Sequence, residues 1–407
     1  MQSKTLWSRN FSLLTVASVL GAAGGIAGSY ALSFLVYDET GSTLAAALLI
    51  AIRVLPQFIL PILIAPIMDR LPRKPFLVCG DLVAGILYCF AGIYLNHYDF
   101  SYPVYLCFSL ILACIGAMDS LAYTSIYPKL IPEGFTQKGY AVSGMLYPVM
   151  NVLIMPLAAI AMERIGVGNI LLIQSGCSVM AAITENLIKI EEKSKIKGIN
   201  YGFSRWKNDL LDGFRYLKGE RGLRSIYTYL AFSNGTAMGY STIMIAFFRT
   251  TAGFTAMMYS FFTAFEFIGR MIGGLFHYRV GIRKQHRFRF AFMVYLVYDL
   301  MDAILLWLPY PAMLGNRALC GFLGINSASL REASVQKYIP EEYRARINAV
   351  QDAVISAAGS IMALIIGAAG EWFDQRMVMT GAAGICILVC LLTIWRNKTS
   401  IEKIYRY

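Results

Sequence analysis

The segment "APIMDRLPRKPF", Ala65 to Phe76, places three cations and one carboxylate directly after a long apolar run. Charged side chains are costly in hydrocarbon, so a cluster at such a boundary is typical of a loop at a membrane surface. Windows of about 20 apolar residues, long enough to cross a bilayer as a helix, recur on both sides of this segment. They predict about twelve spans, near residues 11–37, 44–67, 76–95, 102–126, 141–161, 168–188, 226–248, 255–276, 288–308, 312–330, 347–369 and 377–395.

The composition supports an all-α integral membrane protein. Of the 407 residues, 57% are hydrophobic and only 15% are charged, which is more apolar surface than a soluble core of this length needs. The first window is longer than the apolar part of a secretory signal peptide, and we interpret it as a span.

The distribution of cations predicts the topology. With the N-terminus in the cytoplasm, 30 of the 36 Lys and Arg residues fall on inward tails and loops, three on outward loops and three inside spans. This is the positive-inside asymmetry, and it predicts that both termini are cytoplasmic. The net charge of +12 is then a matter of topology and anionic lipid rather than nucleic acid, and we expect a multi-pass protein of a bacterial cell membrane.

The chain also repeats itself. "KLIPEGFTQKGYAV" begins at Lys129, and "KYIPEEYRARINAV" begins 208 residues later, at Lys337. Six predicted spans separate the copies, which predicts two parallel, pseudo-symmetric six-helix halves. We assign residues 1–188 to the first half, 226–407 to the second and 189–225 to a basic cytoplasmic linker. Four apolar residues in this linker have helical spacing and predict an amphipathic helix on the inner leaflet: Trp206, Leu210, Phe214 and Leu217.

These features together resemble the major facilitator superfamily. Its loop between the second and third helices has the pattern Gly-x-x-x-Asp-Arg-x-Gly-Arg-Lys, and here Asp69, Arg70, Arg73 and Lys74 match it. Ala65 and Pro72 stand where the pattern has glycines. The linker segment "DLLDGFRYLKGERGLRSI", residues 209–226, further resembles bacterial macrolide-efflux and siderophore-export members.

The resemblance implies a role for the charged loop. In the family this loop acts as a latch on the cytoplasmic side, which holds in one conformation and breaks when the inward path opens. We therefore assign to the latch Asp69, Arg70, Arg73, Lys74, Asp81 and Asp119, the last two as acidic partners for the arginines. The alternative is that these cations serve topology alone.

Charges inside the predicted spans are candidates for a substrate or ion pathway, because each must face a bundle interior or a water-filled cavity. Arg53 lies in the second span near Gln57 and has no acidic neighbour in its own helix, so it is either a substrate-binding group or half of a structural ion pair. Glu266 and Arg270 have the i, i+4 spacing of an intrahelical pair, and a role in proton coupling is the alternative.

Three more charges fall in later spans. Asp299 and Asp302 are spaced i, i+3, and we interpret them as structural. Arg317 lies at a depth where it can neutralise Asp302. Softer candidates lie on spans that line the central cavity in the family, and they are Tyr30, Tyr123, Tyr147, Asn151, Phe232, Asn234, Tyr240 and Asn326.

No motif for catalysis or metal binding is present. All eight cysteines fall inside predicted spans without a Cys-x-x-Cys pair, and we interpret them as small core residues. We therefore expect no enzyme, no cofactor and no metal. The hypothesis is a monomeric secondary active transporter that uses a proton gradient and alternating access to export amphipathic organic molecules such as drugs or metabolites. The alternatives are a transporter of lipid-like molecules, a metabolite importer, and a non-transporting sensor or scaffold on the same fold.

Overall fold

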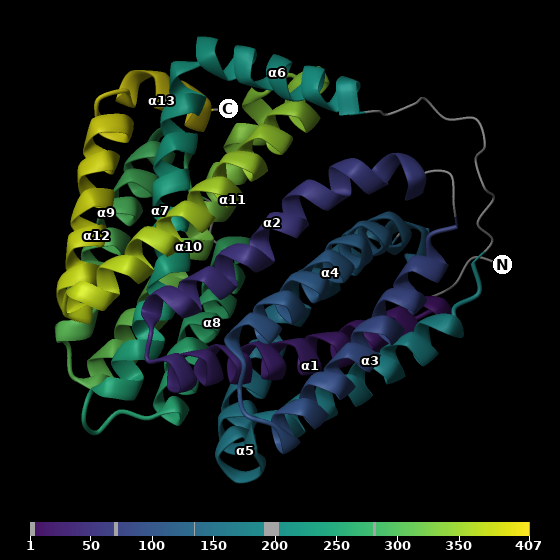
Figure 1. Ribbon diagram of the computed structural model, residues 1–407. Coiled ribbons are helices and arrows are strands. Elements are labelled where there is room, and N and C mark those ends of the chain that lie inside the picture. Colours follow the sequence, from purple (N-terminus) through teal and green to yellow (C-terminus); the bar gives the residue numbers. More distant parts are fainter. Residues whose placement is uncertain (1–4, 69–71, 134, 191–202, 280–281, 407) are drawn as a thin grey trace. The chain divides into compact units, whose positions relative to one another are not determined.

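The computed structural model describes residues 5–68, 72–133, 135–190, 203–279 and 282–406, and across these residues the chain is helical, without strands (Figure 1). The helices form two compact units. The first unit contains residues 1–40 and 52–203, and the second contains residues 41–51 and 204–407.

The first unit is built from α1, most of α2, α3, α4 and α5. Their bounds are Arg9–Thr40, Thr43–Met68, Lys74–His97, Tyr102–Leu130 and Thr136–Asn186. Helix α5 consists of two helical segments that meet at Gly166, whose φ of 76° is a conformation that favours glycine. These two segments correspond to the predicted spans 141–161 and 168–188. Helix α5 packs against α1 and α3.

The second unit contains the remaining elements. They are α6 (Phe203–Gly219), α7 (Arg221–Thr250), α8 (Ala256–Arg279), η1 (Lys284–His286), α9 (Arg287–Ile304), η2 (Leu305–Trp307), α10 (Tyr310–Tyr338), α11 (Glu341–Trp372), α12 (Gln375–Cys390), a π-helical turn η3 (Leu391–Trp395) and α13 (Lys398–Arg406). Closest in this unit are the pairs α7 with α11 and α8 with α10.

The beginning of α2 belongs to the second unit because Glu371, near the end of α11, caps it. The Glu371 carboxylate accepts hydrogen bonds from the Leu44 backbone N–H at 2.9 Å and from the hydroxyls of Ser42 and Thr43 at 2.7 and 3.1 Å. A carboxylate at a helix N-terminus satisfies free N–H groups and opposes the positive end of the helix dipole.

Helix α13 was not anticipated from the sequence. Its Ile401, Ile404 and Tyr405 are buried in a core cluster with α7 and α9, and the hydroxyls of Tyr405 and Tyr295 lie 2.9 Å apart. A polar tail with so few apolar residues gives no span signal, although Ile401, Ile404 and Tyr405 share one helix face.

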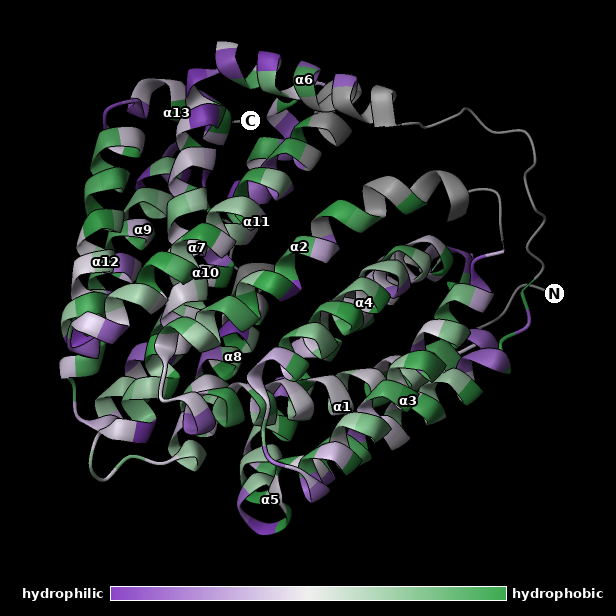
Figure 2. Ribbon diagram, viewed as in Figure 1, coloured by the Kyte–Doolittle hydropathy of each residue, from purple (hydrophilic) through white to green (hydrophobic). Residues whose placement is uncertain are grey.

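Hydrophobic residues are frequent along the long helices (Figure 2), and many large ones are exposed, among them Phe90 and Leu275. Seven helical segments of the described residues are long and apolar enough to cross a bilayer, and every predicted window falls on a helix. The number of twelve crossings stays a prediction. The interpretation of the cysteines as core residues was partly wrong, because Cys79 and Cys107 are exposed while Cys320, Cys386 and Cys390 are buried. An apolar residue of a membrane helix can face lipid as readily as core.

Candidate functional site

A polar cavity of about 240 Å³ lies inside the second unit, between α7, α8, α9 and α10. Many of its lining residues carry a charge or a hydrogen-bonding group. These residues are Tyr229, Ser233, Asn234, Arg270, Tyr295, Tyr298, Cys320, Ser327 and Arg331. Asn234 and Arg270 are the two predicted pathway residues that line this cavity. Charged and hydroxyl groups inside an apolar helical bundle are expensive, which makes this cavity the candidate site.

Glu266 and Arg270 form the predicted intrahelical pair on α8. The Arg270 guanidinium donates to the Glu266 carboxylate at 2.7 Å, and it also lies over the ring of Phe267, 5.5 Å from its centroid. The Arg270 side chain is 45% exposed and that of Glu266 is 20% exposed. The pair therefore has one partly buried member, Glu266, and one exposed member, Arg270, which lines the cavity.

Arg317 on α10 connects this pair to α9. It forms a buried ion pair with Asp302 and lies 4.0 Å from the second carboxylate oxygen of Glu266. Its guanidinium also donates to the Asn316 side-chain oxygen at 3.0 Å. The structure thus brings together Glu266, Arg270, Asp302 and Arg317, which we call the ionic network. Such pairing compensates the cost of burying the charges only when each partner is present.

Close contact between α8 and α10 makes this arrangement possible. A methyl group on Gly269 would overlap the Ala318 carbonyl oxygen, and one on Gly321 would overlap the Glu266 carbonyl oxygen. Glycine at both positions lets the two backbones touch, as small residues do at membrane helix contacts. The spacing Gly269-x-x-x-Gly273 in "GRMIGG" is the sequence signal for this contact, and sequence reasoning missed it.

Asp299 and Asn326 have partners of their own. The Tyr229 hydroxyl donates to Asp299 at 3.1 Å, and both residues are buried. The Asn326 amide donates to the backbone oxygens of Gly273 and Phe322 at 3.1 and 2.7 Å, which joins α10 to α8.

In the first unit, Arg53 of α2 lies close to α1. Its guanidinium donates to the Ser29 hydroxyl at 3.1 Å, and its side chain is half-buried. Gln57, one turn further, is exposed. The buried Gln174 of α5 was missed by the sequence reasoning, and its side-chain oxygen has no hydrogen-bond partner within the described part of the chain.

The acidic residues of the first unit form a second group, which we call the acidic cluster. It consists of Asp81 on α3, Asp119 on α4 and Glu185 on α5, which lie within electrostatic range of one another. Asp119 and Glu185 each have a buried carboxylate oxygen for which the described residues provide no hydrogen-bond partner. Glu185 lies inside the predicted span 168–188, so the rule for charges in spans would have found it.

The charged loop is described in part. Asp69 and Arg70 lie outside the described residues, and Arg73 precedes α3 as its N-cap residue. The Lys74 ammonium donates to the backbone oxygens of Asn186 and Ile188 at 2.6 and 2.8 Å, at the end of α5. A cation at this position opposes the negative end of the α5 dipole. One of the two residues that it contacts, Asn186, directly follows Glu185 in the sequence.

The softer candidates of the first unit are scattered. Tyr30 is buried against Phe34, with ring centroids 4.9 Å apart, whereas Tyr147 is 57% exposed. Asn151 is buried and donates to the Tyr147 backbone oxygen at 2.9 Å. The Ser18 hydroxyl donates to that of Tyr123 at 3.3 Å.

The aromatic and amide candidates of the second unit also lie in different environments. Asn234 lines the cavity, while Tyr240 is buried in an apolar cluster. The cavity residues Tyr298 and Arg331 were missed by the sequence reasoning. Arg331 directly follows the predicted span 312–330, so it was counted as a loop cation.

A bundle of apolar helices with paired charges in its interior is the structure of a multi-pass membrane protein. The sequence model of the Major Facilitator Superfamily matches residues 11–301. The chain therefore belongs to this superfamily, whose members are transporters.

A curated relative agrees with this assignment. The uncharacterized MFS-type transporter YvqJ of Bacillus subtilis (strain 168) is 28% identical over 145 residues. That match covers 35% of this chain and 34% of YvqJ, so it spans about a third of the length of either protein.

Solved structures show the same fold. The nucleoside transporter NupG superimposes with a TM-score of 0.70 at 13% identity, covering 95% of this chain and 99% of that chain. The POT family transporter PepTSo gives 0.69 at 11% identity, covering 97% and 98%. The bacterial homologue of the lysosomal transporter Spinster gives 0.63 at 13% identity, covering 99% and 97%. These similarities show the fold, and it is the family match that makes the protein a transporter rather than an enzyme.

Proposed function

We propose that the protein exports amphipathic organic molecules across the bacterial cell membrane in exchange for protons, by alternating access of its two halves. Twelve spans with both termini in the cytoplasm fit the distribution of its cations. The observation that carries the proposal is the ionic network beside the polar cavity of the second unit. The linker resemblance to efflux proteins supports the outward direction.

The ionic network suits coupling because Glu266 has exchangeable partners. Arg270 lies 2.7 Å from one carboxylate oxygen and Arg317 lies 4.0 Å from the other. A proton on Glu266 removes its charge and weakens both interactions. A polar or cationic substrate group that takes the place of this proton excludes it, and mutual exclusion of proton and substrate at one site gives antiport.

One observation favours a second candidate function. Arg270 lines the cavity with its side chain 45% exposed, so an anionic substrate group can take Arg270 from Glu266. In this scheme a proton compensates the Glu266 carboxylate in place of Arg270, so that substrate and proton bind together. That order of events gives symport and hence uptake of an anionic metabolite.

We also propose that the charged loop and the acidic cluster form the cytoplasmic latch. Asp81, Asp119 and Glu185 repel one another unless cations or protons compensate them. Arg70 and Arg73 are the cations of the loop that we assign to this task, and Lys74 fixes the loop to the end of α5. In this proposal the latch holds in one conformation of the transporter and breaks when the inward path opens. Arg53 of the first unit contributes to the substrate pathway.

The proposal is tested by transport into liposomes that contain the purified protein. A pH gradient is imposed, and cationic, neutral and anionic amphipaths are compared for wild type, Glu266→Gln, Arg53→Ala and the control Glu163→Gln, whose carboxylate is exposed. We expect gradient-dependent movement of cationic or neutral amphipaths that Glu266→Gln and Arg53→Ala abolish and Glu163→Gln retains.

The other outcomes separate the alternatives. Proton-coupled uptake of anionic compounds alone would replace export by the second candidate function. Movement of phospholipid analogues alone would favour a transporter of lipid-like molecules. No movement of any compound, with ligands that still bind, would favour a sensor or scaffold.

A further inference from the structure

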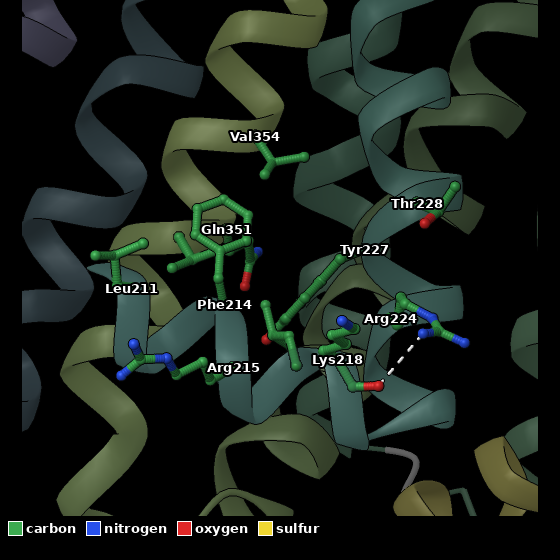
Figure 3. Close-up of a pocket in the computed structure, with 11 residues that line it drawn as sticks. Leu211, Phe214, Arg215, Lys218, Arg224, Tyr227, Thr228, Gln351 and Val354 are labelled. Carbon is green, nitrogen blue, oxygen red and sulfur yellow. Dashed lines mark hydrogen bonds between the residues drawn. The ribbon is translucent and has the colours of Figure 1, made fainter. Parts of the chain in front are cut away.

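A second pocket, of about 440 Å³, lies in the second unit between the linker helix α6, the beginning of α7 and α11 (Figure 3). Its lining is mainly apolar and includes Leu211, Phe214, Leu217, Val350 and Val354. Leu211 and Phe214 on α6 are exposed at 41% and 48%, although they face this pocket. An amphipathic helix normally covers such residues with protein or lipid.

Three cations line the same pocket. They are Arg215 and Lys218 on α6 and Arg224 on α7, all exposed. Arg215 pairs with Asp212 at 3.1 Å, and Arg224 donates to the Lys218 backbone oxygen at 3.3 Å (Figure 3). The pocket therefore combines an apolar interior with an excess of positive charge.

Tyr227 adds a polar side chain to the wall of this pocket. Its buried hydroxyl has no hydrogen-bond partner among the described residues. A buried hydroxyl without a partner costs free energy, which a ligand oxygen can recover. An ester or phosphate oxygen is such an acceptor.

We propose that this pocket binds an anionic phospholipid of the inner leaflet. One acyl chain occupies the apolar interior, and the phosphate lies against Lys218 and Arg224. Basic pockets beside membrane helices suit anionic headgroups, and the acyl chain covers the apolar face of α6 that the protein leaves exposed. The lipid would join α6 to α7 and α11. This goes beyond the proposed transport function and requires only that α6 lie at the cytoplasmic surface.

Native mass spectrometry of the full-length protein in detergent tests the proposal. Phosphatidylglycerol, phosphatidylcholine and free glycerol phosphate are added separately to wild type, to the double variant Lys218→Gln/Arg224→Gln and to the control Arg289→Gln. Arg289 is an exposed cation at the start of α9, outside the pocket. We expect retention of phosphatidylglycerol, about 30-fold weaker binding in the double variant and wild-type binding in the control.

Three results would overturn the proposal. Equal binding of phosphatidylcholine would remove the role of the headgroup charge. An equal loss of phosphatidylglycerol binding in the double variant and in the control would show that the net charge of the protein, and not this pocket, determines binding. Binding of free glycerol phosphate as tight as that of the lipid would make the pocket an anion site rather than a lipid site.

A second measurement uses only the wild-type protein, so no control for the folding of a variant is needed. Phosphatidylglycerol with a photoreactive acyl chain is incorporated with the wild-type protein into nanodiscs, irradiated and mapped by peptide mass spectrometry. We expect adducts on peptides that contain Leu211, Phe214 or Val354. Adducts confined to exposed helix faces elsewhere, such as that of Phe90, would contradict the proposal.

Discussion

In the second unit, Arg317 lies against Asp302 and 4.0 Å from Glu266, whereas in the first unit Asp119 and Glu185 each bury an oxygen that no described residue hydrogen-bonds. The first arrangement compensates charge within the bundle. The second leaves charge to be compensated by protons or by cations of the adjacent loop. Buried charges that are fully paired hold helices together, and those that are incompletely paired respond to a change of conformation or pH.

The largest effect is expected from breaking the pairing in the second unit. Arg317→Met leaves Asp302 as a buried charge without its guanidinium partner, and we expect a loss of about 3–5 kcal/mol in the free energy of unfolding. Titration with a denaturing detergent measures this loss. Arg289→Met, at an exposed position, is the control and should change stability by less than about 0.5 kcal/mol.

The double variant Arg317→Met/Asp302→Asn sharpens that test. Removing both charges takes away the unpaired carboxylate, so part of the lost stability should return. A single variant as stable as wild type would show that the pair is not buried in the folded protein.

The contact between α8 and α10 is expected to matter next. Gly321→Ala places a methyl group against the Glu266 carbonyl oxygen, and we expect it to cost about 1–3 kcal/mol of stability. Gly274→Ala on α8 is the matched control, because the described residues leave the space around Gly274 open. Equal effects of the two substitutions in thermal unfolding would contradict a close helix contact at Gly321.

The acidic cluster should behave in the opposite way to the ionic network. Neutral isosteres, Asp119→Asn or Glu185→Gln, remove repulsion, so we expect unchanged or higher stability, by up to about 1 kcal/mol. Asp302→Asn, measured in parallel, should lose stability because Arg317 then lacks its partner. If all three substitutions destabilise the protein equally, the contrast between the two units does not hold.

The smallest effect is expected from Lys74. Lys74→Met removes a cation from the end of α5 and should cost about 0.5–1 kcal/mol, decreasing as salt concentration rises. Lys74→Arg retains the charge and should retain most of the stability. An effect independent of salt would argue against an electrostatic interaction with the helix end.

The sequence predicted the positions of the long helices because an apolar window is a local signal. It also predicted the pairs Glu266–Arg270 and Arg317–Asp302, one from helical spacing and the other from similar depth. It did not predict that both pairs meet, because that depends on the close approach of α8 and α10, at Gly269 against Ala318 and at Gly321 against Glu266. Gln174 and the packing of α13 were missed for the same reason, since their environment is formed by distant segments.

The central claim is that Glu266 couples proton movement to substrate movement in the second unit. The most direct test is substrate-induced proton flux, measured with a pH-sensitive dye inside liposomes that contain wild type or Glu266→Gln. We predict a flux for wild type that depends on a transported compound and is absent for Glu266→Gln, while Glu163→Gln behaves as wild type. Undiminished substrate-dependent proton flux in Glu266→Gln would contradict the claim and move the coupling group elsewhere, with the acidic cluster of the first unit as the next site to test.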